Sequence, residues 1–430
     1  MSRAVSKLAM FGGPRTISGV DKSAVGWPVV TGAEREALMR VLDSGRFTSN
    51  SMGGGEVQQL EREWAAHTGV PHCAAVSNGT AAIALAVAAL GLAPGDEILV
   101  PALTFIGSAM GAVARGLVPV FVDIDPVSFN LDPKAAEAAI TPRTRAVLAV
   151  HLHGLPCDLA ELRALCERKG LYLIEDAAQA HGAHYRGKRV GGWGEIGCFS
   201  LNVTKNLPTC GEGGLVTTSR LELHEQVILR RQFGEDLRPD RDRDYVSWVP
   251  AGNEKLSAVQ AAFARCQLAR LDKYSRARDR NVRGLLDRLS KLDGVTVPVC
   301  PDDREHAWHI LRLRFDAGAA LGQDVPPGAF RAALHRALKA EGVPLLPYQL
   351  VPLPGQEAFK TGEFAGRYRV EDYPQALAII DDSLTLQRWH LNPGSGPVLS
   401  KVADAFEKAW EGENLERIAL MARTYALASK

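Results

Sequence analysis

Short apolar runs alternate with helical patterns through the first half of the chain. The runs have the length of strands and cover residues 73–77, 97–101, 118–123, 145–154 and 171–176. Apolar residues at helical spacing fill the intervening segments 79–91 and 158–170, and each of these ends at a glycine. Repeated strand–helix–strand units favour a largely parallel sheet covered by helices on both faces. Ligands of such sheets bind at the carboxyl ends of the strands, so polar residues after the apolar runs are the first site candidates.

The pattern changes near residue 255. A helical pattern extends from Leu256 to about Leu289, and a strand-like run, HAWHILRLRF, follows it. The remaining helices and loops are richer in proline. In a chain of 430 residues we therefore expect an N-terminal arm (1–30), a large α/β domain (31–270) and a smaller C-terminal α+β domain (271–430).

Charge and cysteine content exclude several classes of protein. Fifty basic and 49 acidic side chains give a net charge of +1 with no basic block, which argues against nucleic acid or an anionic membrane as the main partner. The first residues lack the apolar core of a signal peptide, and no stretch approaches the ~20 apolar residues that span a bilayer, so we expect a cytoplasmic protein. Seven cysteines without a C-x-x-C pair predict neither a disulfide framework nor a metal site.

A single lysine, Lys205, lies between two strand-like runs in the stretch CFSLNVTKNLPTCGEGGLVTT, residues 198–218. A solvated surface loop is the ordinary interpretation of one lysine. An ammonium group between two buried runs, however, has to be exposed, paired with an anion or used covalently. The polar residues at the other strand ends decide among these.

Three strand ends carry further candidates. Gly79 and Thr80 follow the first run at a helix start, where N–H and hydroxyl groups either cap the helix or bind a phosphate. Glu175 and Asp176 end a very apolar strand, where a carboxylate is costly unless it is paired. Phe105 follows the run at 97–101, and a buried core phenylalanine is its ordinary interpretation.

Taken together with the lysine, these residues describe one ligand: a flat, cationic ring that carries a phosphate and an aldehyde. Asp176 would keep the ring nitrogen protonated, and Phe105 would stack on the ring. The turn at Gly79 and Thr80 would bind the phosphate. Lys205 would condense with the aldehyde. An amine forms an imine best when burial and nearby cations lower its pKa, which fits a lysine between two strand-like runs. The ligand that fits this description is pyridoxal phosphate.

Long motifs along the chain identify a family. They are LAMFGGP, GGGEVQQLEREWAAHTG, VSNGTAAIALAVAAL, PGDEILVPALTFIGSA, PVFVDIDP, ITPRTRAVLAVHLHG, IEDAAQAHGA, GCFSLNVTKNLPTCGEGG and GNEKLSAVQAAF, in this order. Over nearly its whole length the chain resembles the DegT-type family of fold-type I pyridoxal phosphate enzymes, the sugar and aminocyclitol aminotransferases. It is most similar to the branch that contains aminohydroxybenzoate synthase and the glutamine-dependent scyllo-inosose aminotransferases.

The resemblance implies a role for each matching residue. Lys205 matches the lysine that carries the cofactor, and Ser200 matches a serine that binds its phosphate. Asp176 matches the partner of the ring nitrogen, and Gln179 matches the neighbour of the phenolic oxygen. Asn253 resembles an asparagine that reaches the phosphate of the partner subunit, which implies a homodimer with shared active sites.

Two residues depart from the family pattern. Asn202 stands where the family has glutamine, and Lys255 stands where it has arginine. Lysine lacks the planar fork of arginine, so contacts that a bidentate guanidinium makes in relatives are not expected here. The stretch 233–250 is long, and no motif predicts its structure.

The resemblance implies a ping-pong aminotransferase with two small-molecule substrates. The amino donor is glutamine or glutamate, and the acceptor is a keto or aldehyde group of a cyclitol or sugar, in aminoglycoside or other antibiotic biosynthesis. An aminodehydratase of the aminohydroxybenzoate synthase type and a nucleotide-sugar aminotransferase are the alternatives. Retention of Lys205 argues against a non-enzymatic cofactor-binding regulator and against dehydratase relatives in which that lysine is replaced.

Overall fold

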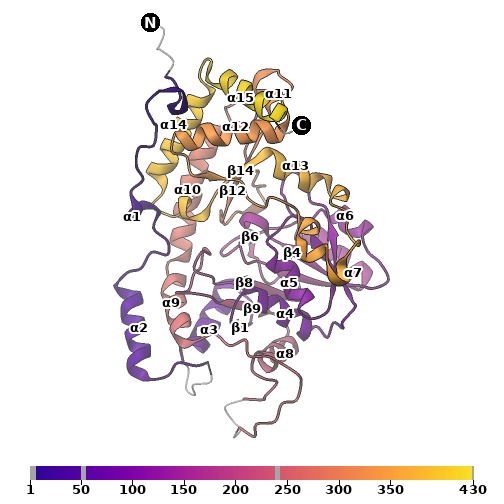
Figure 1. Cartoon of the computed structure of the whole chain (residues 1–430). Helices are drawn as coiled ribbons and strands as arrows, with labels where there is room; N and C mark the ends of the chain where they lie inside the picture. Colours follow the sequence, from indigo (N-terminus) through magenta and orange to yellow (C-terminus); the bar gives the residue numbers. More distant parts are fainter. Residues whose placement is uncertain (1–5, 50–54, 238–242, 429–430) are drawn as a thin grey trace.

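The computed structural model describes residues 6–49, 55–237 and 243–428 (Figure 1). Its largest sheet has seven strands in the order β1-β9-β8-β5-β4-β2-β3. These are β1 (His72–Val76), β2 (Glu97–Pro101), β3 (Val118–Val122), β4 (Thr144–Val150), β5 (Tyr172–Asp176), β8 (Ile196–Ser200) and β9 (Gly214–Thr218). Neighbouring strands from β3 to β8 pair in parallel, and β9 pairs antiparallel with both β8 and β1. The predicted mostly parallel sheet is confirmed.

Helices cover both faces of this sheet. Residues of α4 (Gly79–Ala89), α5 (Gly107–Val113) and α8 (Leu221–Arg231) pack in one hydrophobic core. Residues of α3 (Glu56–Thr68), α7 (Leu159–Lys169) and α9 (Ala258–Leu268) pack in a second core, with α6 (Pro133–Ala138). In β1, Ala74 and Val76 belong to the first core whereas Cys73 and Ala75 belong to the second, as the alternation of side chains along a strand requires.

The C-terminal part of the chain forms a second, antiparallel sheet with its own core. Its four strands, in the order β10-β12-β14-β13, are β10 (Val295–Thr296), β12 (Leu311–Phe315), β14 (Ser383–Leu386) and β13 (Leu345–Leu346). The helices around it are α10 (Leu271–Leu289), α11 (Ala317–Leu321), α12 (Pro327–Ala340), α14 (Gly396–Trp410) and α15 (Asn414–Ala428), at the top of Figure 1. The N-terminal residues Leu8 and Ile17 also pack in this core.

The segment that follows β13 crosses back to the large sheet. Phe359 and two residues of α13 (Pro374–Asp382), Ala376 and Ile379, pack in the core that contains α4 and α5. The division into 1–30, 31–270 and 271–430 stays a prediction, and it assigns this segment to the smaller unit although its side chains pack against the larger one.

The helical pattern from Leu256 to Leu289 forms two helices rather than one. α9 begins after Ser257, whose side chain makes a capping box with Gln260. The break falls at Arg270, which has φ −113° and ψ −4°. Its guanidinium donates a hydrogen bond to Thr31 Oγ1 at 3.0 Å and another to the Glu34 carboxylate. Thr31 directly precedes α2 (Gly32–Ser44), and Glu34 lies in its first turn. The division between α9 and α10 thus coincides with contacts to α2, which the helical periodicity of the sequence does not predict.

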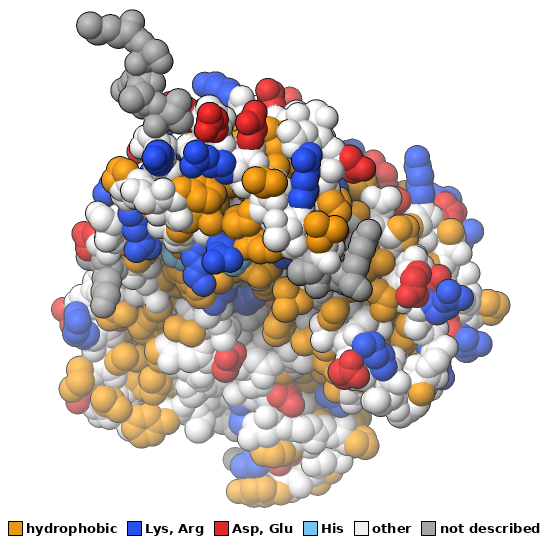
Figure 2. Space-filling view, turned by 45° about the horizontal axis from the view of Figure 1, so that its top comes forward, with side chains coloured by type: hydrophobic (Ala, Val, Ile, Leu, Met, Phe, Trp, Pro, Cys, Tyr) orange, Lys and Arg blue, Asp and Glu red, His pale blue; other side chains and the backbone are white. Residues whose placement is uncertain are grey.

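The remaining regular elements are short. They are α1 (Lys22–Val25), the strands β6 (His184–Tyr185), β7 (Lys188–Arg189) and β11 (Arg304–Glu305), and 3-10 turns at Ala9–Phe11, Leu152–Gly154, Leu353–Gly355, Glu357–Phe359, Gly362–Phe364, Val370–Asp372 and Arg388–His390. Across the three described ranges, no helix is both long enough and apolar enough to cross a membrane. On the face drawn in Figure 2, basic and acidic side chains are scattered among hydrophobic and other side chains.

Candidate active site

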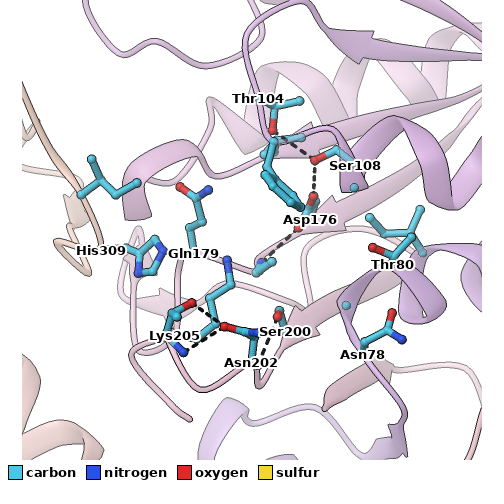
Figure 3. A pocket seen from close by; sticks show the side chains of 18 of the residues that line it. Asn78, Thr80, Thr104, Ser108, Asp176, Gln179, Ser200, Asn202, Lys205 and His309 are labelled. Carbon is cyan, nitrogen blue, oxygen red and sulfur yellow. Dashed lines mark hydrogen bonds between the residues drawn. The ribbon is translucent and has the colours of Figure 1, made fainter. Parts of the chain in front are cut away.

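A cavity of about 480 Å³ lies where the carboxyl ends of the parallel strands meet the N-terminus of α4. All the predicted site residues line it except Asn253. Figure 3 shows Asp176 and Lys205 between Thr80 and Asn78 on one side and His309 on the other. The residues at the strand ends therefore lie together around one cavity, as predicted for a parallel sheet.

Asp176, the last residue of β5, presents its carboxylate to the cavity while it is itself only 5% exposed. Its Oδ2 accepts a hydrogen bond from Ser108 Oγ at 2.7 Å, and its Oδ1 accepts one from the Ala178 N–H at 3.1 Å. The Ser108 hydroxyl lies 3.1 Å from Thr104 Oγ1 (Figure 3). These contacts orient the carboxylate but leave it without a cationic side-chain partner among the described residues.

Glu175, the neighbouring carboxylate, points away from the cavity. It is fully buried and accepts hydrogen bonds from the N–H groups of Gly191 (2.7 Å), Trp193 (2.6 Å) and Gly194 (2.9 Å). Its Oε2 also lies 3.2 Å from His151 Nε2. Burial raises the pKa of Glu175, but these hydrogen bonds outweigh it and hold the pKa below its usual value. Strand alternation therefore separates a structural carboxylate from one that faces the site.

Lys205 lies in the loop between β8 and β9, half-buried, with its side chain in the cavity. The loop is held by a hydrogen bond from the Lys205 N–H to the Asn202 carbonyl (2.8 Å) and by one from Trp27 Nε1 to the Lys205 carbonyl (3.0 Å). Burial lowers the pKa of Lys205 to about 8, and Arg388 acts in the same direction while Asp176 opposes it. About a tenth of this amine is thus neutral, and nucleophilic, at pH 7, far more than of a lysine with its ordinary pKa.

The N-terminus of α4 forms the opposite side of the cavity. The Asn78 side chain caps the helix by accepting a hydrogen bond from the Ala81 N–H at 2.8 Å. The N–H groups of Gly79 and Thr80 have no acceptor within the helix and stand beside Ser200. A Cβ on Gly79 would come within 2.8 Å of the Ser200 Cβ, so only glycine allows the helix to approach β8 this closely. Amides and hydroxyls gathered at a helix N-terminus make an anion-binding site.

Phe105 and Gln179 complete the predicted set. Phe105 is 57% exposed, so it is not a core residue, and its ring is available to stack on a ligand in the cavity. Gln179 is buried, and its Oε1 accepts a hydrogen bond from the His153 N–H at 2.7 Å. That bond leaves the NH₂ group of the amide as a donor, and the Gln179 side chain lowers the pKa of the Tyr348 phenol, against the larger effect of burial, which raises it.

Sequence reasoning missed the part of the wall that comes from the C-terminal sheet and its loops. Four residues there line the cavity: the apolar Ile310 and the polar His309, Tyr348 and Arg388. Burial lowers the pKa of His309 well below its usual value, which makes its imidazole neutral. Ser108 was also missed, although its spacing of four residues from Thr104, on the helix turn after β2, is a signal that could have found it.

Asn253 lies outside the cavity of its own chain, exposed at the surface, and its backbone forms a bridge with Gln232. Lys255 pairs with Val76, and its Nζ lies 4.2 Å from the centre of the Phe233 ring. Of the stretch 233–250, for which no structure was predicted, residues 238–242 lie outside the described residues, and backbone hydrogen bonds hold both of its ends. The Phe233 N–H donates to the Gly252 carbonyl, and the Trp248 N–H donates to the Gly234 carbonyl, each at 2.8 Å.

The chain belongs to the DegT/DnrJ/EryC1/StrS aminotransferase family, which it matches over residues 29–393. The enzymes of this family depend on pyridoxal phosphate, and this protein is a pyridoxal phosphate-dependent aminotransferase. The predicted family, fold class, cofactor and enzyme class are thereby confirmed.

Individual relatives carry out different reactions. The 3-amino-5-hydroxybenzoate synthase of Amycolatopsis mediterranei is 43% identical over 67% of this chain and 74% of its own. The dTDP-3-amino-3,4,6-trideoxy-alpha-D-glucose transaminase of Streptomyces venezuelae is 38% identical over 74% of this chain and 78% of its own. The L-glutamine:2-deoxy-scyllo-inosose aminotransferase of Streptoalloteichus tenebrarius is 37% identical over 75% and 76%. These names support an aminotransferase acting on a sugar or a carbocycle and leave the acceptor open.

A solved structure, that of S. venezuelae DesV, superposes with a TM-score of 0.78 at 35% identity, covering 89% of this chain and 95% of that one.

The residues present fit pyridoxal phosphate. The cavity provides a carboxylate that can hold a ring nitrogen, an exposed aromatic face and a lysine whose pKa is lowered to about 8. The free amides at the start of α4 stand beside the Ser200 hydroxyl, where a phosphate would lie. Each functional group of the cofactor thus has a complementary group in the chain.

Proposed function

We propose that this protein transfers the amino group of glutamine or glutamate to a keto or aldehyde group of a small cyclitol or sugar, in the biosynthesis of an aminoglycoside or another antibiotic. The observation that carries the proposal is that Lys205 and Asp176 line the same cavity (Figure 3). The scyllo-inosose and hydroxybenzoate relatives support a carbocyclic acceptor.

We assign the cofactor contacts to named residues. Lys205 Nζ would hold the cofactor at its aldehyde carbon, and Asp176 would hold the proton on the ring nitrogen. Gly79, Thr80 and Ser200 would bind the phosphate. Phe105 would cover one face of the ring, and Gln179 would lie beside its phenolic oxygen. When bound, pyridoxal phosphate supplies the electron sink that accepts the electrons left on a substrate carbon.

Lys205 also moves the proton. In the half-reaction with the amino donor, Nζ of Lys205 would take the proton from the α-carbon of the donor. In the second half of the ping-pong cycle the same amine returns a proton to the acceptor carbon. A pKa of about 8 suits both directions, because an amine with a pKa near the working pH is available in both protonation states.

The match of Asn253 to an asparagine of the family supports a homodimer in which the two subunits share their active sites. Asn253 is exposed outside its own cavity, as expected of a residue that completes the phosphate site of a partner subunit. The mixing experiment in the Discussion tests this assignment.

The acceptor is tested by offering three compounds to enzyme that carries pyridoxamine phosphate. They are scyllo-inosose, its 2-deoxy analogue and a nucleotide-linked 4-keto sugar, and the return of the visible absorption band is followed for each. We expect the cyclitols to react faster, because Lys255 replaces the arginine whose fork suits a diphosphate. A faster reaction with the nucleotide sugar would favour the function of the S. venezuelae relative instead.

An aminodehydratase is the second candidate, favoured by the 43% identity to the hydroxybenzoate synthase. It uses the same lysine, so the test is the product. Loss of water and formation of an aromatic ring from an aminated cyclohexenone carboxylate would show this activity.

A further inference from the structure

The backbone of Lys205 is held by two hydrogen bonds of different origin. Within its own loop, the Lys205 N–H donates to the Asn202 carbonyl at 2.8 Å. Within the described residues, no backbone N–H donates to the Lys205 carbonyl, and its hydrogen bond comes from Trp27 Nε1 at 3.0 Å. A side chain that lies 178 positions earlier in the chain therefore completes the backbone hydrogen bonding of the lysine.

The indole ring of Trp27 is itself fixed by two side chains of α10. Tyr274 meets it edge to face, with ring centroids 6.1 Å apart and an angle of 62° between the planes. The Arg278 guanidinium carbon lies 5.6 Å from the centre of the same ring. Because Tyr274 and Arg278 are four positions apart on one helix, they lie on the same face of α10. The ring is thus held in one orientation, with its N–H directed at the Lys205 carbonyl.

Arg278 is a buried cation that the proposed chemistry does not otherwise use. It is 1% exposed, and its Nε and Nη1 atoms have no hydrogen-bond partner among the described residues. Burial lowers the pKa of Arg278 to about 10. A desolvated guanidinium close to an aromatic ring gains a cation–π attraction, which offsets part of the cost of burying the charge. The contact with Trp27 therefore stabilises both side chains.

The backbone on either side of Trp27 is attached to two further parts of the chain. The Gly26 carbonyl accepts a hydrogen bond from Asn392 Nδ2 at 3.2 Å, and the Val29 carbonyl accepts one from Gln267 Nε2 at 2.9 Å. Asn392 follows the last strand of the C-terminal sheet, whereas Gln267 lies in α9, beside the large sheet. The position of the indole N–H therefore depends on both parts of the molecule.

We propose that Trp27 is a positioning residue for Lys205: its indole N–H fixes the backbone of the lysine, and Arg278 in turn fixes the indole. The proposal rests on the proposed function, in which Lys205 holds the cofactor. Neither Trp27 nor Arg278 lines the cavity, so both act through Lys205. A lysine side chain is long and flexible, and a fixed backbone limits where its amine can move.

The pKa of Lys205 distinguishes positioning from a merely structural role. Burial is the largest cause of its lowered value, about 8, so a looser backbone that lets the amine reach solvent would raise the pKa toward its ordinary value. A merely structural role of Trp27 would lower stability and leave this pKa unchanged. The pH profile of covalent cofactor uptake by apoenzyme separates the two, because only the neutral amine reacts.

The test compares Trp27→Phe with the parent. Phenylalanine keeps a ring beside Tyr274 and Arg278 but has no N–H group. At pH 7 the rate constant for covalent uptake of pyridoxal phosphate should fall by about 3- to 10-fold, the effect of one lost hydrogen bond. The pH at which the rate levels off should rise by at least about half a pH unit. Hydrogen–deuterium exchange of residues 203–207 should also be faster, whereas exchange in β9 should match the parent.

Arg278→Met tests the same contact from its other end. Methionine replaces the buried cation with an apolar chain and leaves the indole N–H in place, so uptake should fall by about 2-fold. The double variant should be no worse than Trp27→Phe alone, because Arg278 acts through the indole. Trp410→Phe is the matched control. Trp410 Nε1 also donates to a backbone carbonyl, that of Asp293 at 2.8 Å, but it is not among the residues that line the cavity, and uptake should be unchanged.

Two results overturn the proposal. One is a parental uptake rate and pH profile in Trp27→Phe or, if that variant does not fold, in Arg278→Met. The other is an equal change in Trp410→Phe, which would show a general loss of stability. Failure of the proposed function is a different result, because borohydride would then fix the cofactor of the parent enzyme to a lysine other than Lys205.

Discussion

The two walls of the cavity were built in different ways. One wall consists of residues that follow parallel strands or begin α4, and nearly all of these residues belong to short sequence motifs. The other wall, with His309, Tyr348 and Arg388, comes from segments more than 100 residues further along the chain. The first wall supplies the groups that fit pyridoxal phosphate, the cofactor of the whole family. The second wall supplies groups that can distinguish one substrate from another. Variants in the first wall should therefore abolish chemistry, whereas variants in the second should change which substrate reacts.

The largest effect is expected from Lys205→Ala. The variant lacks both the covalent link to the cofactor and the amine that moves the proton, so turnover should fall by at least ~10⁴-fold. Single-turnover spectra measure this, together with loss of the absorption band that borohydride fixes in the parent. Parental turnover in the variant would show that another residue carries the cofactor.

Asp176→Asn should lower the rate of proton removal from the donor by about 10²- to 10⁴-fold, because an amide cannot keep the ring nitrogen protonated. The cofactor should still bind, since the phosphate and lysine contacts remain. A kinetic isotope effect with donor deuterated at the α-carbon checks which step is slowed. Near-parental turnover would falsify the role of Asp176.

Subunit mixing tests whether the first wall is complete within one chain. Asn253→Ala alone should weaken cofactor binding by about 10-fold, the loss of one hydrogen bond to a charged phosphate. At a cofactor concentration too low to saturate Asn253→Ala enzyme, exchange with Lys205→Ala subunits should give heterodimers in which one site has both residues intact, and activity should return. If activity stays absent after verified exchange, with Asn253→Ala impaired alone, the contact does not cross between subunits.

The pKa of Lys205 predicts how apoenzyme takes up the cofactor. Only the neutral amine attacks an aldehyde, so the rate of covalent incorporation should rise about 10-fold per pH unit below pH 8 and level off above it. An unperturbed lysine would instead keep rising toward pH 10. Stopped-flow absorbance between pH 6 and 10 distinguishes the two curves.

Glu175→Gln should have the smallest effect on chemistry and a clear one on stability. Glu175 accepts three backbone hydrogen bonds away from the cavity, and an amide NH₂ would face at least one of those donors. We expect a loss of roughly 1–3 kcal/mol in the free energy of unfolding, with the turnover of folded enzyme within a few-fold of the parent. Urea unfolding and active-site titration measure the two quantities. The adjacent Asp176→Asn is the matched comparison, because it should show the reverse pattern.

The amino-acid sequence by itself determined the parallel sheet, the cofactor and the residues at the strand ends. The physical reason is that apolar periodicity and helix starts are local, and parallel strands bring their carboxyl ends together whatever the details of packing. Lys205, Asp176 and the Gly79–Thr80 turn could be placed in this way before any coordinates were considered.

Only the tertiary structure decided how individual side chains are oriented and which distant segments of the chain meet. It turned Asp176 toward the cavity and Glu175 away from it, exposed Phe105, and divided the helical pattern at Arg270. It also brought Arg388 and Tyr348 to the cavity from elements of the second sheet. No spacing in the sequence encodes that approach, because it results from how two separately packed cores meet.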